Sequence, residues 1–152
     1  MNIRLMVEED IDSVEQIETQ LFSKPWTKQD FINSLSDMHN IYVVAENEQQ
    51  EIIGYSGIWG VLDEGQITNV AVRTQDQGKG IGYEMLCELI EIGKNEGLQQ
   101  FTLEVRKSNE KAIHLYEKLG FIDEGIRKNF YDKPVEDAII MWLREQHDEQ
   151  ED

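Results

Sequence analysis

The chain has 152 residues, of which 39% are hydrophobic and 30% are charged, and its formal net charge at pH 7 is −17. This composition fits one globular domain with a single core and excludes a disordered chain. Nucleic acid is not expected as a direct partner, because few cations offset its phosphates. We expect no membrane span, because the apolar runs are short, and no secretion signal, so a cytoplasmic protein is the simplest interpretation.

The acidic charge is distributed unevenly. Residues 1–70 hold 3 Lys/Arg against 13 Asp/Glu, whereas residues 71–144 hold 11 against 13. The second part is therefore the better place for an anionic ligand, and the first part is expected to face solvent or a basic substrate. We expect a single domain over residues 1–144 and an acidic, disordered tail over residues 145–152.

Hydrophobic periodicity predicts the elements in chain order. The first half is expected to contain a strand, two helices and three strands, at residues 2–6, 10–21, 27–35, 41–45, 52–62 and 66–73. The second half is expected to contain a helix, a strand, a helix and two strands, at residues 80–95, 100–105, 109–119, from 121, and 135–143. The order β-αα-βββ-α-β-α-ββ predicts a mixed sheet with helices on its faces, an α/β or α+β architecture.

Three positions refine this outline. Thr27 is expected to cap the second helix at its N-terminus. Gly97 is expected to end the helix at 80–95. The single cysteine, Cys87, shares helical spacing with apolar neighbours, so we expect a small core side chain there rather than a reactive thiol. One cysteine also excludes a disulfide within the chain.

A glycine-rich turn, Gln77-Gly78-Lys79-Gly80-Ile81-Gly82, connects a strand to a helix. Such a turn gathers free N–H groups at the positive end of the helix dipole, and its glycines let an anion come close. Its last glycine is not followed by Lys-Ser/Thr, which argues against a P-loop, and its spacing does not suit a dinucleotide fold. We predict an anion-binding turn, and a glycine-rich loop without a ligand stays the alternative.

The turn also resembles a family signature. Gln77-x-x-Gly80-x-Gly82 is similar to the Q/R-x-x-G-x-G/A motif of the GCN5-related N-acetyltransferases (GNAT). A second block is similar to the ribosomal-protein-alanine branch of this family: Leu103-Glu104-Val105-Arg106-x-Ser108-Asn109-x-x-Ala112-x-x-Leu115-Tyr116-x-x-x-Gly120-Phe121. The resemblance covers nearly the whole chain. It implies the GNAT fold, a mixed and mostly antiparallel sheet flanked by about four helices, with acetyl-CoA as cosubstrate and no metal.

The resemblance implies a set of residues that contact acetyl-CoA: Val70, Ala71, Val72, Gln77, Gly78, Lys79, Gly80, Ile81, Gly82, Asn109 and Tyr116. The backbone of Val70–Val72 is expected to pair with the pantetheine arm and to polarise the thioester oxygen. Asn109 has a simpler alternative role as a helix N-cap. Lys79, Arg106, Lys107 and Lys111 are candidates for phosphate contacts or for solvated surface.

Acetyl transfer to an amine needs a base for the attacking amine and an acid for the leaving thiolate. In the family, the residue that matches Glu104 is the general base and the residue that matches Tyr116 is the general acid. The structural alternatives are a strand carboxylate paired with Arg106 and a core tyrosine with a structural hydrogen bond. Because no covalent nucleophile is evident, we expect direct transfer.

For the acceptor, the resemblance implies a protein N-terminus, specifically the N-terminal alanine of small-subunit ribosomal protein eighteen. An α-amine, with a pKa of about 7.7–8.0, needs only a weak base. The alternatives are a small amine, a lysine, or an acetyl-CoA-binding module without turnover, and the oligomeric state stays open. Trp26 and Tyr131 are expected to bind the acceptor, with a hydrophobic staple and an ordinary hairpin residue as alternatives.

Two positions depart from the family pattern. Gln77 replaces the commoner arginine of the phosphate loop, so the affinity for the cofactor is expected to be lower. Phe130 stands where a second tyrosine is often found, which leaves Tyr131 alone to hydrogen-bond the acceptor.

Overall fold

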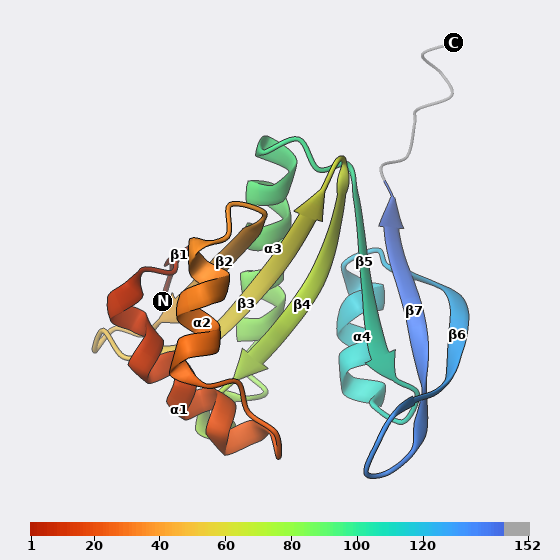
Figure 1. Cartoon of the computed structure of the whole chain (residues 1–152), viewed down its shortest axis with the longest axis horizontal. Helices are drawn as coiled ribbons and strands as arrows, with labels where there is room; N and C mark the ends of the chain where they lie inside the picture. Colours follow the sequence, from red (N-terminus) through yellow and green to blue (C-terminus); the bar gives the residue numbers. More distant parts are fainter. Residues whose placement is uncertain (145–152) are drawn as a thin grey trace.

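The computed structural model describes residues 1–144, and the tail expected at residues 145–152 lies outside the described residues. One seven-stranded sheet runs through the molecule (Figure 1). The elements in chain order are β1 (Asn2–Leu5), η1 (Glu8–Asp10), α1 (Ile11–Leu21), α2 (Lys28–Ser36), β2 (Asn40–Glu46), β3 (Ile52–Val61), β4 (Glu64–Val72), η2 (Thr74–Asp76), α3 (Ile81–Asn95), β5 (Gln100–Arg106), α4 (Glu110–Lys118), β6 (Ile122–Tyr131) and β7 (Glu136–Arg144).

This order confirms the predicted sequence of strands and α-helices, and the predicted ends differ by one or two residues. The two short 3-10 helices were not expected. The strand order in the sheet is β1-β2-β3-β4-β5-β7-β6. All neighbours are antiparallel except β4 and β5, so the mixed, mostly antiparallel sheet is confirmed.

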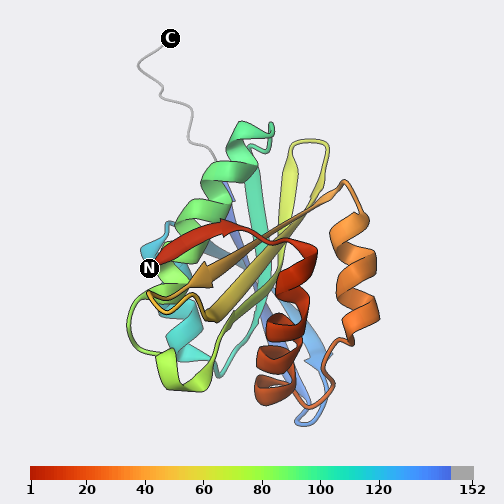
Figure 2. The same cartoon turned by 90° about the vertical axis from the view of Figure 1, so that its left-hand side faces the viewer.

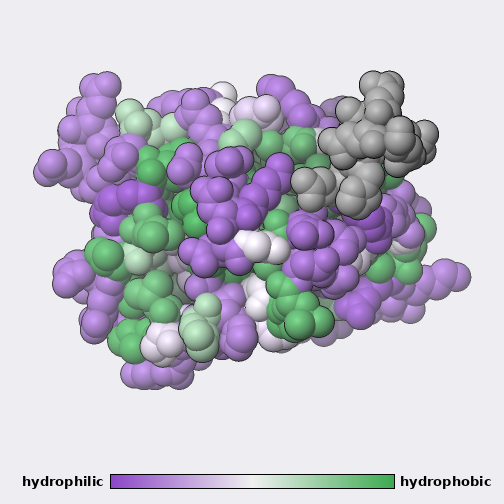
Figure 3. Space-filling model, turned by 90° about the horizontal axis from the view of Figure 1, so that it is seen from above, coloured by the Kyte–Doolittle hydropathy of each residue, from purple (hydrophilic) through white to green (hydrophobic). Residues whose placement is uncertain are grey.

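Helices cover both faces of the sheet. Figure 2 shows α1 and α2 on one side and α3 on the other. The α3 side buries a stripe of α3, represented by Leu86 and Leu89, against Phe101 and Leu103 of β5. Among the helices of residues 1–144, none combines the length and the apolar character that a membrane span needs. On the face seen from above, hydrophilic residues are interspersed with groups of hydrophobic residues (Figure 3).

Cys87 is exposed, so its predicted place in the core is wrong. On α3 the buried positions are Ile81, Met85, Leu86, Leu89, Ile90 and Gly93. Successive residues of a helix are about 100° apart, and Cys87 falls just past the edge of this buried stripe. Apolar neighbours in the sequence did not place the thiol on the apolar face.

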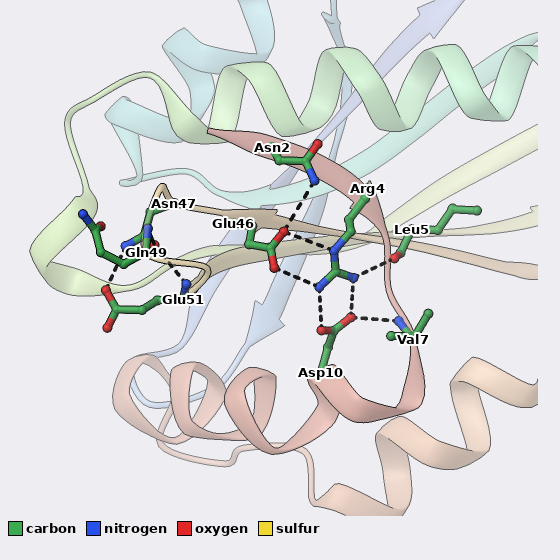
Figure 4. Close-up of polar contacts among 9 residues, drawn as sticks. All are labelled: Asn2, Arg4, Leu5, Val7, Asp10, Glu46, Asn47, Gln49 and Glu51. Carbon is green, nitrogen blue, oxygen red and sulfur yellow. Dashed lines mark hydrogen bonds and ion pairs between the residues drawn. The ribbon is translucent and has the colours of Figure 1, made fainter.

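An ion-pair cluster anchors the start of α1 to the first two strands (Figure 4). The Arg4 guanidinium binds both carboxylate oxygens of Asp10 at 2.8 Å and reaches Glu46 of β2 at 3.3 Å. Asp10 also accepts the N–H of Val7 at 2.9 Å. Burial raises the pKa of Asp10, but Arg4 and Val7 outweigh it and hold this pKa below its ordinary value. The cluster fixes the N-terminus of α1 on the sheet.

The sheet opens between β4 and β5. These strands pair only through Glu64, Gly65 and Gln66, and beyond this point they diverge (Figure 1). A β-bulge lies at the same place, because Gly57 and Ile58 of β3 pair with Asn69 and Ile67, which skips Thr68. A bulge bends its strand and increases the local twist. The opening exposes the edge of β4 that carries Val70, and it positions the site described next.

Candidate active site

Two pockets lie at the opening between β4 and β5. The loop pocket, of about 550 Å³, lies between the glycine-rich turn and α4. The hairpin pocket, of about 560 Å³, lies between the α1–α2 connection and the β6–β7 hairpin. Both volumes are in the range of small-molecule sites. The two pockets share Val70 and Tyr116, so a group held in one can meet a group held in the other at these residues.

The glycine-rich turn has the geometry of an anion site. Gly78 and Gly80 both have a φ of +81°, in the left-handed region that favours glycine. A Cβ atom at either position would meet nothing within 4 Å, so the space above the turn is open. None of the backbone hydrogen bonds within residues 1–144 uses the N–H groups of residues 78–83. These free donors at the N-terminus of α3 fit a phosphate.

The side chains of the turn are used differently from the expectation. The Gln77 amide donates to the carbonyl of Val72 at 3.0 Å, which closes the turn onto β4. Lys79 reaches Asp76 at 3.2 Å, and Arg73 forms a second ion pair with the same carboxylate. These contacts, Arg73 first, hold the pKa of Asp76 below its ordinary value. Asp76, which the sequence did not single out, thus joins Arg73 to Lys79 of the turn and also lines the loop pocket.

The proposed cofactor residues of β4 divide between the two faces of the sheet. Val70 and Val72 line the loop pocket, as do Gln77, Gly78, Gly80, Ile81 and Gly82. The side chain of Ala71 does not line it, because it is 3% exposed and packs in the core under α1 and α2. Alternation along a strand explains this division. Only the backbone of Ala71 remains available for the role expected of it.

Helix α4 forms the other side of the loop pocket. The Asn109 side chain accepts the N–H of Ala112 at 3.2 Å, so its alternative role as an N-cap is confirmed. Asn109 also lines the pocket, together with Lys111, His114 and Lys118. Of the four cations named as candidates for phosphates, only Lys111 lines this pocket, and Arg106 lies in the other one. The sequence did not identify His114 and Lys118 as pocket residues, because both lie on the exposed face of an amphipathic helix, where solvated polar side chains are expected.

Tyr116 lies at the junction of the two pockets. Its side chain is buried, with 8% exposure, and packs edge-on against Phe121 with 6.0 Å between ring centroids. Burial, and then the neighbouring Tyr131, raises the pKa of Tyr116 to about 12. The hydroxyl is therefore a protonated donor throughout the neutral pH range.

Glu104 enters the hairpin pocket from β5. Its neighbours Leu103 and Val105 are buried on the α3 side, so Glu104 projects to the opposite face. One carboxylate oxygen accepts from Gln66 at 3.3 Å and the other from Arg127 at 2.8 Å. The expected alternative pairing with Arg106 is wrong. A carboxylate oxygen has two lone pairs, so each keeps room for a water or an amine.

Arg106 instead supports the β6–β7 hairpin. It binds Glu136 at 3.3 Å and the carbonyls of Asp132 and Pro134 at 3.0 Å. Its guanidinium also lies over the ring of Tyr131, 4.4 Å from the centroid. Burial, and then the charge of Glu104, raises the pKa of Tyr131. Tyr131 thus stands in the hairpin pocket close to the candidate base.

Trp26 lies in the wall of the hairpin pocket that the α1–α2 connection forms, on the side opposite the β6–β7 hairpin. It immediately precedes the N-cap residue Thr27, and its ring lies 5.3 Å from that of Phe31. This is the hydrophobic staple that the sequence offered as an alternative. The same packing holds the indole at the pocket, so the staple is compatible with the predicted contact to the acceptor, which stays a prediction. Glu18, Phe22 and Lys24 share this wall and were not predicted.

Comparisons with known proteins find relatives in sequence and in structure. A family model described as the acetyltransferase (GNAT) family matches residues 11–121. A protein of Bacillus subtilis (strain 168) is 39% identical over 141 residues, which cover 93% of each chain. The ribosomal protein bS18-alanine N-acetyltransferase of Haemophilus influenzae is 38% identical over 135 residues, 87% of this chain and 90% of the relative. The crystal structure of the ribosomal-protein-S18-alanine N-acetyltransferase from Escherichia coli superposes with a TM-score of 0.87 at 31% identity, covering 97% and 96% of the two chains.

Proposed function

The chain belongs to the acetyltransferase (GNAT) family, and on that basis we propose that it transfers the acetyl group of acetyl-CoA to the N-terminal alanine of ribosomal protein bS18. The observation that carries this proposal is the meeting of two pockets at Val70 and Tyr116. One pocket has free backbone donors for an anion, and the other has a carboxylate for an amine. The names of the relatives supply the acceptor.

The loop pocket fits acetyl-CoA. The free N–H groups of residues 78–83 suit its pyrophosphate, and the open space above Gly78 and Gly80 leaves room for it. Lys111 and Lys118 add positive charge on the opposite wall. The unpaired edge of β4 near Val70 offers backbone groups to an extended arm. This edge leads from the turn to the junction with the hairpin pocket.

Acetyl-CoA supplies a reactive acetyl thioester, and the protons are handled by residues of the chain. Glu104 accepts the proton of the acceptor ammonium, directly or through a water. Tyr116 donates its hydroxyl proton to the leaving sulfur at the junction. The cysteine of the chain, Cys87, lies on the outer face of α3, away from both pockets, so we assign it no part in the transfer.

A panel of acceptors tests the proposal. We expect the highest kcat/KM for a peptide with the N-terminal residues of bS18, and little turnover of polyamines or of a lysine peptide with a blocked α-amine. The readout is the release of free CoA thiol. Turnover confined to polyamines would refute the assignment to protein N-termini while leaving the acetyltransferase class intact.

The turn itself makes a separate prediction. Gly80→Ala is expected to raise the KM for acetyl-CoA about tenfold with little change in kcat, because a Cβ atom intrudes where the phosphate approaches and the left-handed backbone is strained. Gly97→Ala is the matched control, since Gly97 has a φ of +99° and equally open space but lies at the far end of α3. Equal effects of both substitutions on this KM would contradict the role of the turn.

A further inference from the structure

Glu18 is a buried acidic residue that the chemistry above does not use. It lies in the last turn of α1 and is 4% exposed. Among the ion pairs of residues 1–144, none includes its carboxylate. A buried carboxylate without a cation depends on hydrogen bonds for its stability, so its donors indicate its role.

The donors to Glu18 come from two different parts of the fold. The backbone N–H of Trp26 donates to one carboxylate oxygen at 3.0 Å. The hydroxyl of Tyr55, a fully buried residue of β3, donates to the other oxygen. The backbone carbonyl of Glu18 also accepts the N–H of Phe22 at 3.0 Å. One residue therefore ties the connection between α1 and α2 to the helix before it and to the sheet.

Aromatic packing completes this arrangement. The ring of Phe31 lies 5.3 Å from Trp26 and meets Tyr55 edge-on at 5.7 Å. Trp26 is thus held at its backbone by Glu18 and at its ring by Phe31, and both of these contact Tyr55. On the sheet, Tyr55 is the direct partner of Ala71, the neighbour of Val70 at the junction.

The connection held in this way is the wall of the hairpin pocket that faces Glu104. Phe22, Lys24 and Trp26 belong to it. Phe22 is 44% exposed, so its ring is accessible to an acceptor in this pocket. A short connection between helices has little structure of its own. Its distance from the junction is therefore set by the contacts that hold it, and the bond from the Trp26 N–H to Glu18 is one of them.

We propose that Glu18 is a positioning residue for the acceptor, which sets the wall of Phe22, Lys24 and Trp26 at a fixed distance from the junction of the two pockets. This inference rests on the assignment of the hairpin pocket to the acceptor. The role is geometric rather than electrostatic. A glutamine can accept the Trp26 N–H and can donate to the Tyr55 oxygen, whereas an alanine leaves both groups without a partner.

Steady-state kinetics of four variants test the role. Glu18→Ala is expected to raise the KM for the acceptor peptide about tenfold, with the KM for acetyl-CoA within twofold, and Glu18→Gln is expected to restore the acceptor KM to within twofold. Tyr55→Phe removes one donor to Glu18 and keeps the ring, so it is expected to raise the KM for the acceptor peptide about threefold. This variant replaces Glu18→Ala in the test if the alanine variant fails to fold. Asp12→Ala is the matched control, because Asp12 is an exposed acidic residue of the same helix that pairs with the Lys28 ammonium outside the pocket. Equal losses in the glutamine and alanine variants would overturn the proposal.

Trp26 gives a second readout that does not need turnover. Replacing Trp59 and Trp142 with phenylalanine leaves Trp26 as the single indole among the three of the chain. In that background, Glu18→Ala is expected to raise the acrylamide quenching constant of Trp26 about twofold, and Glu18→Gln is expected to leave it unchanged. Unchanged quenching in the alanine variant would overturn the inference. An inactive wild type with this quenching pattern would count only against the proposed function.

Discussion

Glu104→Gln is expected to lower kcat about a hundredfold at pH 7, with the KM for acetyl-CoA within twofold. Glutamine keeps the size of the side chain and its contact with Gln66, but it cannot accept the acceptor's proton. Glu104 lies in the hairpin pocket rather than the loop pocket, so the binding of acetyl-CoA is expected to be spared. The measurement is the initial rate of CoA release with an N-terminal peptide, at varied concentrations of both substrates.

The pH dependence of this defect separates a base from a structural carboxylate. The α-amine of the acceptor has a pKa of about 7.7–8.0, so above about pH 9 most of it is already deprotonated. The deficit of Glu104→Gln relative to the wild type is therefore expected to shrink as the pH rises past 8. Glu124→Gln removes another arginine-paired carboxylate of this sheet, outside both pockets, and serves as the control. A deficit that stays constant from pH 6.5 to 9.5 would argue that Glu104 is not the base.

Tyr116→Phe is the second substitution with a large expected effect. It is expected to lower kcat about a hundredfold, because it removes the proton donor at the junction and leaves the buried ring in place. The contact with Phe121 does not involve the hydroxyl, so the free energy of unfolding is expected to change by only about 1 kcal/mol. Urea denaturation and substrate saturation curves measure the two effects separately.

The raised pKa of Tyr116 predicts how the activity of the wild type depends on pH. The acid form persists below the folded pKa of about 12 and is lost only as the pH rises through that value. The kcat/KM of the wild type is therefore expected not to decline between pH 8 and 10 through ionisation of this residue. A decline with an apparent pKa near 10 that disappears in Tyr116→Phe would show an exposed, ordinary phenol instead.

Local patterns in the sequence predicted the helices and strands well, because each kind of element has its own spacing of apolar residues. The buried positions Leu86, Leu89 and Ile90 of α3 and the N-cap at Thr27 are examples that occur as predicted. Spacing alone was less reliable at the edge of a stripe, as the exposed Cys87 shows. Composition and motif together predicted the glycine-rich turn and its free donors.

Long-range pairing was beyond the sequence. Glu104 pairs with Arg127 of β6 rather than with Arg106. The two residues are 23 positions apart in the sequence, and the side chains meet across β7, which lies between β5 and β6. The opening between β4 and β5 depends on a parallel pairing and on a bulge at Thr68, neither of which has a sequence signal of its own.

Glu18 did carry a signal that could have been used. It follows Ile11 and Val14 at helical spacing and thus falls on the apolar stripe of α1, where a carboxylate is out of place. A charged residue on the buried face of a helix needs partners from elsewhere in the fold. Its position predicts burial and hydrogen bonding, although the identity of Tyr55 and Trp26 as donors requires the structure.

The most direct test of transfer to an N-terminal α-amine is the location of the acetyl group by tandem mass spectrometry. The substrate is one peptide that begins with a free alanine and carries an internal lysine. We predict that the wild type places the acetyl group on the α-amine, and that Glu104→Gln and Tyr116→Phe each slow this transfer about a hundredfold at pH 7. Acetylation of the lysine alone, or transfer to the α-amine at the wild-type rate in both variants, would contradict this function and mechanism.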